Sequence, residues 1–489
     1  MPLCGGRIGL ATVRKLSLTK GISEVRASHT ITPVFDDPNL VSASGLVPVM
    51  RLAESAGLSD LLAEHLSVGS PNASAKAGCV IGGVLAGADS IDDLDMLRHG
   101  AMPRLFGGLR APSTLGTYLR SFTHSHVQQL DAVSSRLLAG LAARAPGLLA
   151  GAGPEGIAFI DVDDSVRAVH GYAKQAAAYG YTGVRGLNFQ IAALSTPLVA
   201  PVVAAARLRR GNTASHAGSG RLLAQAITTG RRAGVAGQIM ARADSAHFCH
   251  TFVGAAIRAK IWFSVTARMN TPVTAAIAAI GEDAWTPISY PHAIWEEAEQ
   301  CWISDAEVAE VPITVFTSRR KADHVTCRLV VRRVKRLNPQ TPAGKGKPGS
   351  VQEELFATYR HHGFITNSTL GTIEADQRHR DHAVVEQVIA ELKDGPIAHL
   401  PSGSYAANAA WLAHAVIAFN LARTAGVLAS NRHARARWAT LRTHLINVPG
   451  RVASSARRLT LHLPLDWPWA DAWQALFAAA TGPPATVTA

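Results

Sequence analysis

Residues 156–165 read GIAFIDVDDS, and this stretch decides the fold. Its apolar first part is typical of a strand buried in the middle of a sheet, and the run finishes in acidic residues. Because side chains alternate along a strand, Asp161 and Asp163 share one face. Two buried carboxylates repel each other unless a cation or a positive side chain compensates them. The stretch therefore predicts either a metal-binding pair or a capped turn at Asp163, Asp164 and Ser165.

A second strand with the same kind of ending follows. Residues 238–245 read QIMARADS, an apolar strand that finishes in Asp244 before a helical stretch. Asp and Ser are also favoured N-cap residues, so a plain helix start is the structural alternative. Ligand sites in α/β sheets gather at the carboxyl ends of strands, and here two core strands each deliver an acid. This repetition favours one shared site.

A third acid lies on a predicted helix within 381–395, DHAVVEQVIAELKDG. It belongs to a polar stripe made of His379, His382, Glu386 and Lys393. At 100° per residue these positions project within roughly 60° of one another. Apolar residues of the same helix form a separate packing face. The stripe is either a solvated face with salt bridges or a face turned toward a cleft.

Around these acids the chain predicts a mixed α/β core between helical regions. Helical periodicity dominates from about residue 40 to 150, which suits either a helix-turn-helix-like DNA reader or a plain helical bundle. After Gly151 we expect three strands, a helix, a strand, a helix and a strand, with the strands at 156–165, 165–172, 186–195, 238–245 and 260–269. Short basic strand candidates fill 270–370, and helices return after them.

Composition sets limits on the class of protein. The 489 residues are 47% hydrophobic and 17% charged, which predicts a globular fold with a large core. The net charge of +13 favours polyanionic partners such as nucleic acid, although a merely basic soluble protein is the alternative. The apolar stretch 191–208 contains two prolines and ends in arginines, so we expect a buried strand and no membrane span.

The cysteines and the N-terminus exclude other classes. The five cysteines form no CxxC pair, which argues against a disulfide framework or a zinc ribbon and fits a reducing compartment. His247, Cys249 and His250 are close in sequence, but no second ligand cluster has matching spacing, so we do not expect zinc there. The N-terminal segment with Arg7 and Arg14 does not predict a signal peptide.

Together these features resemble the RNase H-like catalytic domain of bacterial insertion-sequence DDE transposases. The third motif of that family runs Tyr, two residues, Arg, three residues, Glu, six residues, Lys. The spacing from Glu386 to Lys393 matches, while His379 and His382 replace Tyr and Arg. The chain resembles the IS-1380 group, related to the IS-4 superfamily, from about 40 to 475. The phrases that carry this likeness are FIDVDDS, RLRRGN, ARADSAHF, YRHHGFITNS, AELKDG and FNLAR.

The resemblance implies that Asp163, Asp244 and Glu386 are the catalytic, metal-binding acids. Asp163 is preferred because the family's first acid stands two positions before a Ser or Thr, here Ser165, and Asp161 is the backup. Two Mg²⁺ ions roughly 3.5–4 Å apart, with Mn²⁺ as a substitute, would activate the attacking oxygen and stabilise the leaving one. Asp163 would bridge the ions, and the other two acids would each complete one site.

The implied partner is double-stranded DNA: the terminal inverted repeats of the element and the target. Contacts between basic side chains and the phosphate backbone of DNA give affinity and salt dependence but little sequence selection. The predicted DNA-binding residues are Lys393, His379, His382, Arg207, Arg209, Arg210, Arg319, Arg320, Arg332, Arg333, Lys335 and Arg336. Trp285, Trp295 and Trp302 are candidates to stack on a flipped base, with burial in the core as the favoured alternative.

The expected organisation is an α/β protein with an RNase H-like mixed-sheet core, an inserted β-rich subdomain and flanking helices. The expected parts are a basic flexible arm (1–30), a helical DNA-binding domain (31–150), the first part of the core (151–268), the β-rich insertion (269–370), the core helix with the third acid (371–430) and a C-terminal helical region (431–489). A homodimer in the DNA complex and a cytoplasmic location, on the nucleoid when bound to DNA, are expected.

Three other functions remain open. The first is an RNase H-like nuclease without strand transfer, which would use the same carboxylates. The second is a non-catalytic DNA-binding protein derived from a transposase, against which the three intact acids count. The third is a zinc hydrolase that uses His379 and His382.

Overall fold

The computed structural model describes residues 31–288, 295–296, 301–302, 306–335, 359–456 and 458–482. The chain forms two units, residues 1–37 and 38–489. The described part of the first unit, residues 31–37, contains no helix or strand, and all elements below belong to the second. The predicted basic arm (1–30) and Arg336 lie outside the described residues.

The five core strands form a mixed sheet in the order β5-β4-β2-β6-β7. They are β2 (Ile157–Ala168), β4 (Arg185–Ser195), β5 (Val202–Arg210), β6 (Gln238–Ala243) and β7 (Trp262–Thr266). β4 is antiparallel to β2 and β5, whereas β6 and β7 run parallel to β2. The short strand β3 (Ala178–Tyr179) pairs with the first two residues of β4, on the edge with which β5 pairs further along.

The predicted strand boundaries around the acids were wrong. The stretches 156–165 and 165–172 were expected to be two strands, but one strand, β2, runs through the acidic residues to Ala168. Its far half continues to pair with β4, from Asp163 opposite Ile191 to Ala168 opposite Gly186, so the acids cause no turn. The third strand of the core is β5, and the apolar stretch 191–208 that was expected to be a buried strand contains the end of β4 and most of β5.

The basic, β-rich segment extends this sheet. Its strand β13 (Tyr359–Thr366) pairs with β7, with Phe364 opposite Thr266. The strands β12 (Val325–Lys335), β11 (Ala306–Val315) and β8 (Thr286–Ile288) follow in that order. The pair β9 (Trp295–Glu296) and β10 (Cys301–Trp302) is separate. The continuity through β13 was not predicted, because sequence periodicity does not reveal which strands become neighbours.

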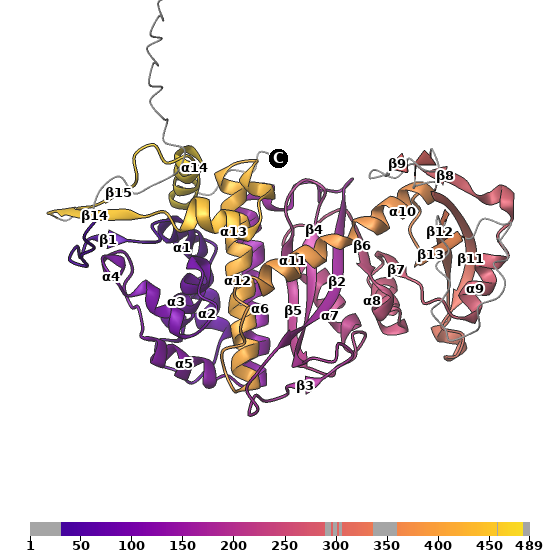
Figure 1. Ribbon diagram of the computed structural model, residues 1–489, viewed down its shortest axis with the longest axis horizontal. Coiled ribbons are helices and arrows are strands. Elements are labelled where there is room, and N and C mark those ends of the chain that lie inside the picture. The colour runs from indigo at the N-terminus through magenta and orange to yellow at the C-terminus, as the bar shows by residue number, and fades with distance from the viewer. Residues whose placement is uncertain are drawn as a thin grey trace, which may run out of the picture. The chain divides into compact units, whose positions relative to one another are not determined.

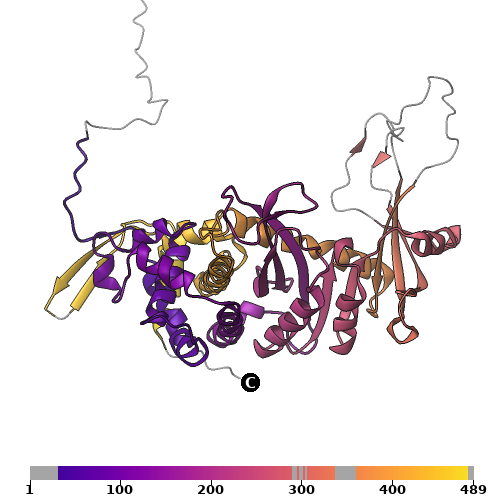
Figure 2. The same ribbon diagram turned by 90° about the horizontal axis from the view of Figure 1, so that it is seen from below.

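Helices cover both faces of the sheet (Figures 1 and 2). α7 (Ser219–Arg232) and α8 (His250–Arg258) lie on one face, and α11 (Val384–Lys393) crosses β2 and β4 on the other. The long helix α12 (Tyr405–Ala429) packs beside α6 (His124–Arg144) and against the edge strand β5. The amide of Asn420 on α12 bonds both backbone groups of Val203, at 2.8 and 2.9 Å, and so caps this strand edge.

The remaining elements flank this core. In the N-terminal part they are β1 (Leu40–Val41), α1 (Leu46–Ser55), α2 (Leu58–His65), α3 (Ala73–Ala86), η1 (Asp92–Leu97), α4 (Met102–Leu105), α5 (Pro112–Arg120) and η2 (Pro146–Leu149). Further along they are η3 (Ser245–His247), α9 (Thr271–Ala278), η4 (Glu282–Ala284), η5 (Lys321–Asp323), α10 (Thr372–Arg380) and η6 (Asp381–Ala383). The C-terminal part adds η7 (His433–Arg435), α13 (Trp438–Leu441), η8 (Arg442–Ile446), β14 (Gly450–Ser455), β15 (Arg458–His462) and α14 (Ala470–Thr481); β14 pairs with β1 and β15.

One helix in the described part of the chain, α12, is long and apolar enough to cross a membrane. Its apolar window is 89% buried against the rest of the fold. α12 is therefore a core helix of this unit.

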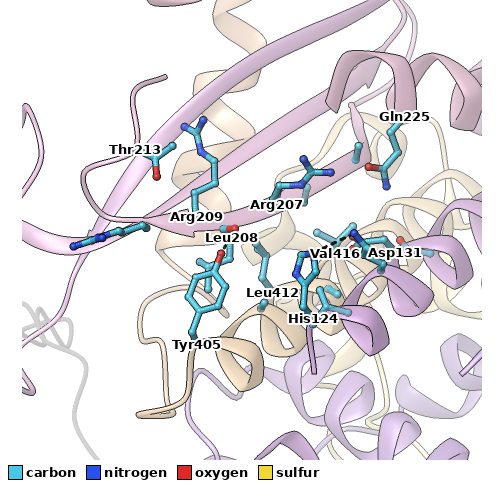
Figure 3. A pocket seen from close by; sticks show the side chains of 18 of the residues that line it. His124, Asp131, Arg207, Leu208, Arg209, Thr213, Gln225, Tyr405, Leu412 and Val416 are labelled. Carbon is cyan, nitrogen blue, oxygen red and sulfur yellow. Dashed lines mark hydrogen bonds between the residues drawn. The ribbon is translucent and has the colours of Figure 1, made fainter. Parts of the chain in front are cut away.

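A cavity of about 290 Å³ lies where α6 and α12 meet β5 and α7 (Figure 3). Asp131 from α6 and Arg207 from β5 both line it. Burial raises the pKa of Asp131 to about 7, although the positive charge of Arg207 opposes the shift. Arg207, predicted to contact DNA, thus forms part of the wall of this cavity.

The carboxyl group of Asp131 should make the free energy of unfolding depend on pH. Its pKa is higher in the folded chain than in the unfolded chain, so stability falls as pH rises from about 4 through about 7. Asp131→Asn removes this penalty, so at pH 8 the variant should be more stable than the wild type by on the order of 4 kcal/mol. Denaturant unfolding at pH 5 and pH 8 measures the difference. An equal stability difference at both pH values would contradict this account.

Candidate active site

The register of β2 against β6 brings two acids side by side. Val162 pairs with Ala243, so the next step along both strands places Asp163 beside Asp244 on one face. β6 ends at Ala243, and Asp244 is the N-cap of η3, where its Oδ1 accepts the N–H of Ala246 at 3.0 Å. Asp244 therefore is the helix cap that the sequence offered as an alternative, and it also lies in a carboxylate pair with Asp163.

Three side chains could hold a cation at this point. Ligand atoms of Asp163, Asp244 and His247 all lie within 4.8 Å of one another. The side chain of Asp244 is 49% exposed and that of His247 is fully buried. The site is thus open to solvent on the Asp244 side and closed behind it by the histidine.

The pKa values of the two carboxyl groups are shifted in opposite directions. Burial raises the pKa of Asp163 to about 6, and the charges of Asp244 and Asp164 add to the shift. Burial also acts on Asp244, but the hydrogen bonds that its carboxylate accepts from His247 and from the backbone N–H of Ala246 outweigh it and lower the pKa of Asp244. A bound cation would relieve the repulsion within this pair. Carboxylate oxygens are the ligands that Mg²⁺ and Mn²⁺ prefer, so the residues present fit a divalent ion.

Asp161, the backup first acid, is engaged in an ion pair. Its carboxylate accepts two hydrogen bonds from Arg242, at 2.6 and 2.8 Å, and both side chains are buried. Arg242 also donates to the carbonyl of Arg378 at 2.6 Å and lies over the ring of Phe159. Both oxygens of Asp161 are therefore occupied, which favours Asp163 as the first acid.

Asp164 points to the other face of the sheet and is also paired. Its carboxylate bonds Asn188 and lies 2.9 Å from the guanidinium of Arg209. Arg209 donates in addition to the carbonyls of Ser215 and Ala217. This buried network holds β2, β4 and β5 in register next to the site.

The third predicted acid, Glu386, lies on α11 and is exposed. It is not among the groups within 4.8 Å, and it borders a cavity of about 430 Å³ that Trp438 also lines. Lys393, at the end of the same helix, donates to Ser165 Oγ at 3.3 Å. Ser165 follows Asp163 by two residues on the same face of β2, so the stripe that carries Glu386 ends beside the carboxylate pair.

The two histidines of the stripe are hydrogen-bonded to other groups of the protein. His379 is buried, stacks on Phe364, and bonds Ser264 and Thr266 through its two ring nitrogens at 2.8 and 3.1 Å. Burial lowers the pKa of His379 well below its usual value. In this structure the ring packs α10 onto β7 and β13, and a contact of His379 with DNA stays a prediction. His382 is half-buried and donates from Nδ1 to the carbonyl of His379 at 2.7 Å.

Several predicted DNA-binding arginines have carboxylate partners instead. Arg209 pairs with Asp164, Arg332 with Asp376 at 2.8 Å, and Arg333 with Glu307 at 2.6 Å. Arg209 and Arg333 are buried, so their ion pairs hold the fold together, and their role as DNA contacts stays a prediction. The exposed candidates are Arg210, Arg319 and Arg320, the last two near Asp323. The side chain of Lys335 is not described.

Sequence reasoning did not assign two residues of the site. His247 was considered only as part of a zinc cluster. Tyr181, in the turn between β3 and β4, is 75% exposed. Partial burial and the nearby carboxylates of the site raise the pKa of its phenol. The signal in the sequence was the pair of tyrosines in YGYTG (179–183), which only the folded chain brings to the acids.

Trp285 is buried against Arg333, as the core alternative predicted.

Fold and site together define a class of protein: an α/β enzyme whose carboxylate pair, at neighbouring strands of a mixed sheet, suits metal-assisted phosphoryl transfer. The family model described as Transposase DDE domain group 1 matches residues 23–339 and 357–481. The match covers most of the chain, so the chain belongs to this family. It is a DDE transposase, and the family implies an RNase H-like core, DNA binding and divalent metal ions. No curated protein matches the chain.

Divalent cations should stabilise the protein in a pH-dependent way. Below about pH 6 Asp163 holds a proton that a cation must displace, whereas above it the ion relieves two repelling charges. Saturating Mn²⁺ should therefore raise the Tm by a few degrees at pH 7.5 and by much less at pH 5. Thermal unfolding with Asp163→Asn as the control measures this. An equal shift in wild type and variant would place the ion elsewhere.

Asp161 and Asp163 should respond in opposite ways to the same substitution. Asp161→Asn leaves Arg242 as a buried, unpaired charge and should cost about 3–5 kcal/mol of unfolding free energy. Asp163→Asn removes a carboxylate that lacks a cationic partner, so it should cost nothing or stabilise slightly. Urea denaturation of both variants at pH 7.5 without metal tests the pair. A loss of stability in Asp163→Asn as large as in Asp161→Asn would contradict the assignment.

Proposed function

We propose that this chain is the transposase of a bacterial insertion sequence of the IS-1380 group, and that it cuts the element's ends and joins them to target DNA. The observation that carries the proposal is the placement of Asp163 beside Asp244, with Lys393 of α11 bonded to Ser165, two residues further along β2. Membership of the DDE transposase family supports the same reaction class.

In this proposal Asp163, Asp244 and Glu386 are the catalytic acids. The family's divalent ions would supply an activated oxygen nucleophile and would neutralise charge on the oxygens that enter and leave. Asp163 on β2 and Asp244 just after β6 would hold the ions, together with Glu386 on α11. The support for Glu386 is its place on the stripe that ends at Lys393. Cleavage frees a 3′-hydroxyl, which then attacks a phosphodiester of the target at the same acids.

The remaining residues bind and orient DNA. Lys393 is half-buried next to Ser165, where its ammonium group would contact the phosphate beside the cut. Arg210, Arg319 and Arg320 are exposed cations that would hold the backbone. The helical region 31–150 would recognise the terminal repeats, and two copies of the chain would act together, since both ends must be cut. The rival function is a nuclease that hydrolyses DNA with the same acids but does not join it.

An oligonucleotide assay distinguishes transposase from nuclease. A pre-cut terminal-repeat duplex is incubated with a plasmid, the full-length protein and Mg²⁺ or Mn²⁺. The proposal predicts covalent joining, reduced on the order of 100- to 1,000-fold in Asp163→Asn and Asp244→Asn, because the metal's charge stabilisation is worth several kcal/mol. Glu386→Gln should fall by a similar factor.

Asp394→Asn is the matched control for Glu386→Gln, since Asp394 is an exposed acid at the end of the same helix and should keep full activity. Cleavage without joined product would favour the nuclease. Full joining by Glu386→Gln would remove that residue from the proposal while leaving the carboxylate pair intact.

A further inference from the structure

His247 occupies the closed side of the carboxylate site. The ring is fully buried at the end of η3, between the sheet and Phe252 of α8, and its ring centroid lies 6.2 Å from that of Phe252. Its Nδ1 lies 2.9 Å from Asp244 Oδ1. This buried imidazole therefore contacts a carboxylate that is itself half-exposed.

The hydrogen bonds behind the ring fix its tautomer. Gln190 on β4 places its amide nitrogen 3.2 Å from His247 Nε2 and 2.9 Å from the carbonyl of Ser215. An amide nitrogen only donates, so Nε2 accepts, and the ring proton is on Nδ1. His247 thus donates from Nδ1 to Asp244. The chain of donors runs from a buried amide through the imidazole to the carboxylate.

These bonds leave one oxygen of Asp244 available. Both the N–H of Ala246 and Nδ1 of His247 donate to Oδ1, at 3.0 and 2.9 Å. Among the described residues, no hydrogen bond reaches Oδ2. The two donors hold the carboxylate in one orientation, and neither of them occupies the lone pairs of Oδ2.

We propose that His247 is a positioning residue that holds the Asp244 carboxylate in its cation-binding orientation; this inference rests on the proposed role of Asp244 as a metal-binding acid. Partners of this kind typically change metal affinity 10- to 100-fold when they are removed. A direct ligand role is disfavoured because Nδ1 carries the proton and Nε2 already accepts from Gln190.

Two substitutions of similar polarity separate these roles. In His247→Asn the side-chain amide can donate from near the position of Nδ1, whereas in His247→Gln it reaches the position of Nε2. Affinity for Mn²⁺ is measured by electron paramagnetic resonance on the full-length protein without DNA, with the Tm as a check of folding. We expect His247→Asn to bind within about threefold of wild type and His247→Gln to bind about 10- to 100-fold more weakly.

Equal loss in both variants would overturn the proposal and indicate that an imidazole nitrogen ligates the ion. Wild-type affinity in His247→Gln would overturn it as well. If His247→Gln does not fold, Gln190→Met, which keeps the ring but removes the donor to Nε2, should bind Mn²⁺ several-fold more weakly, and unchanged affinity would overturn the inference. Asp244→Asn tests the proposed function separately: if it retains Mn²⁺ affinity, the metal site is wrong whatever the histidine variants show.

Discussion

The parallel pairing of β2 with β6 is the constraint on which the site depends. Its register sets two rows of charged side chains next to each other on one face, Asp161 beside Arg242 and then Asp163 beside Asp244. In the first row the charges are opposite, and the buried pair is satisfied within the fold. In the second row they are alike, and burial raises the pKa of Asp163. A step of two residues thus separates a structural ion pair from a pair of acids that has no positively charged side chain between them.

The residues around Asp163 and Asp244 hold these two side chains in place without neutralising their charge. Asp164 directs its charge to Arg209 on the opposite face, so Arg209 is not available to compensate Asp163. His247 bonds only one oxygen of Asp244 and is buried behind it. On the open face, Lys393 reaches Ser165 from α11. The protein thereby keeps a negative site beside the ammonium group of Lys393, which is the arrangement that a cation and a polyanion can share.

Some of this could be predicted from the sequence. The apolar runs that end in Asp163 and Asp244 predicted two core strands with acids on one face, and the mixed α/β character of the core followed from periodicity. The preference for Asp163 over Asp161 rested on the family resemblance and not on the strand pattern, because the pattern does not show which residue of β6 lies opposite each acid. The strand break expected near Ser165 was wrong for a related reason: pairing with β4 carries β2 through its acidic residues.

Charge runs were the least informative signal. Arg209, Arg332 and Arg333 all belong to runs that predicted DNA contacts, yet each faces a carboxylate from a distant segment. His379 was predicted to bind phosphate from its helical stripe, but Phe364, from a strand that joins the core sheet unexpectedly, buries it. His247 was missed because its partner Gln190 is 57 residues away. These roles depend on contacts between distant segments, which local patterns do not contain.

The central claim is that Asp163 and Asp244 together bind a divalent cation. Anomalous diffraction from a crystal of the full-length protein soaked in Mn²⁺ tests it most directly. The account predicts an anomalous peak in contact with one carboxylate oxygen of each acid, and no peak at Asp161, where Arg242 occupies both oxygens. Manganese bound elsewhere with none between Asp163 and Asp244 would contradict it.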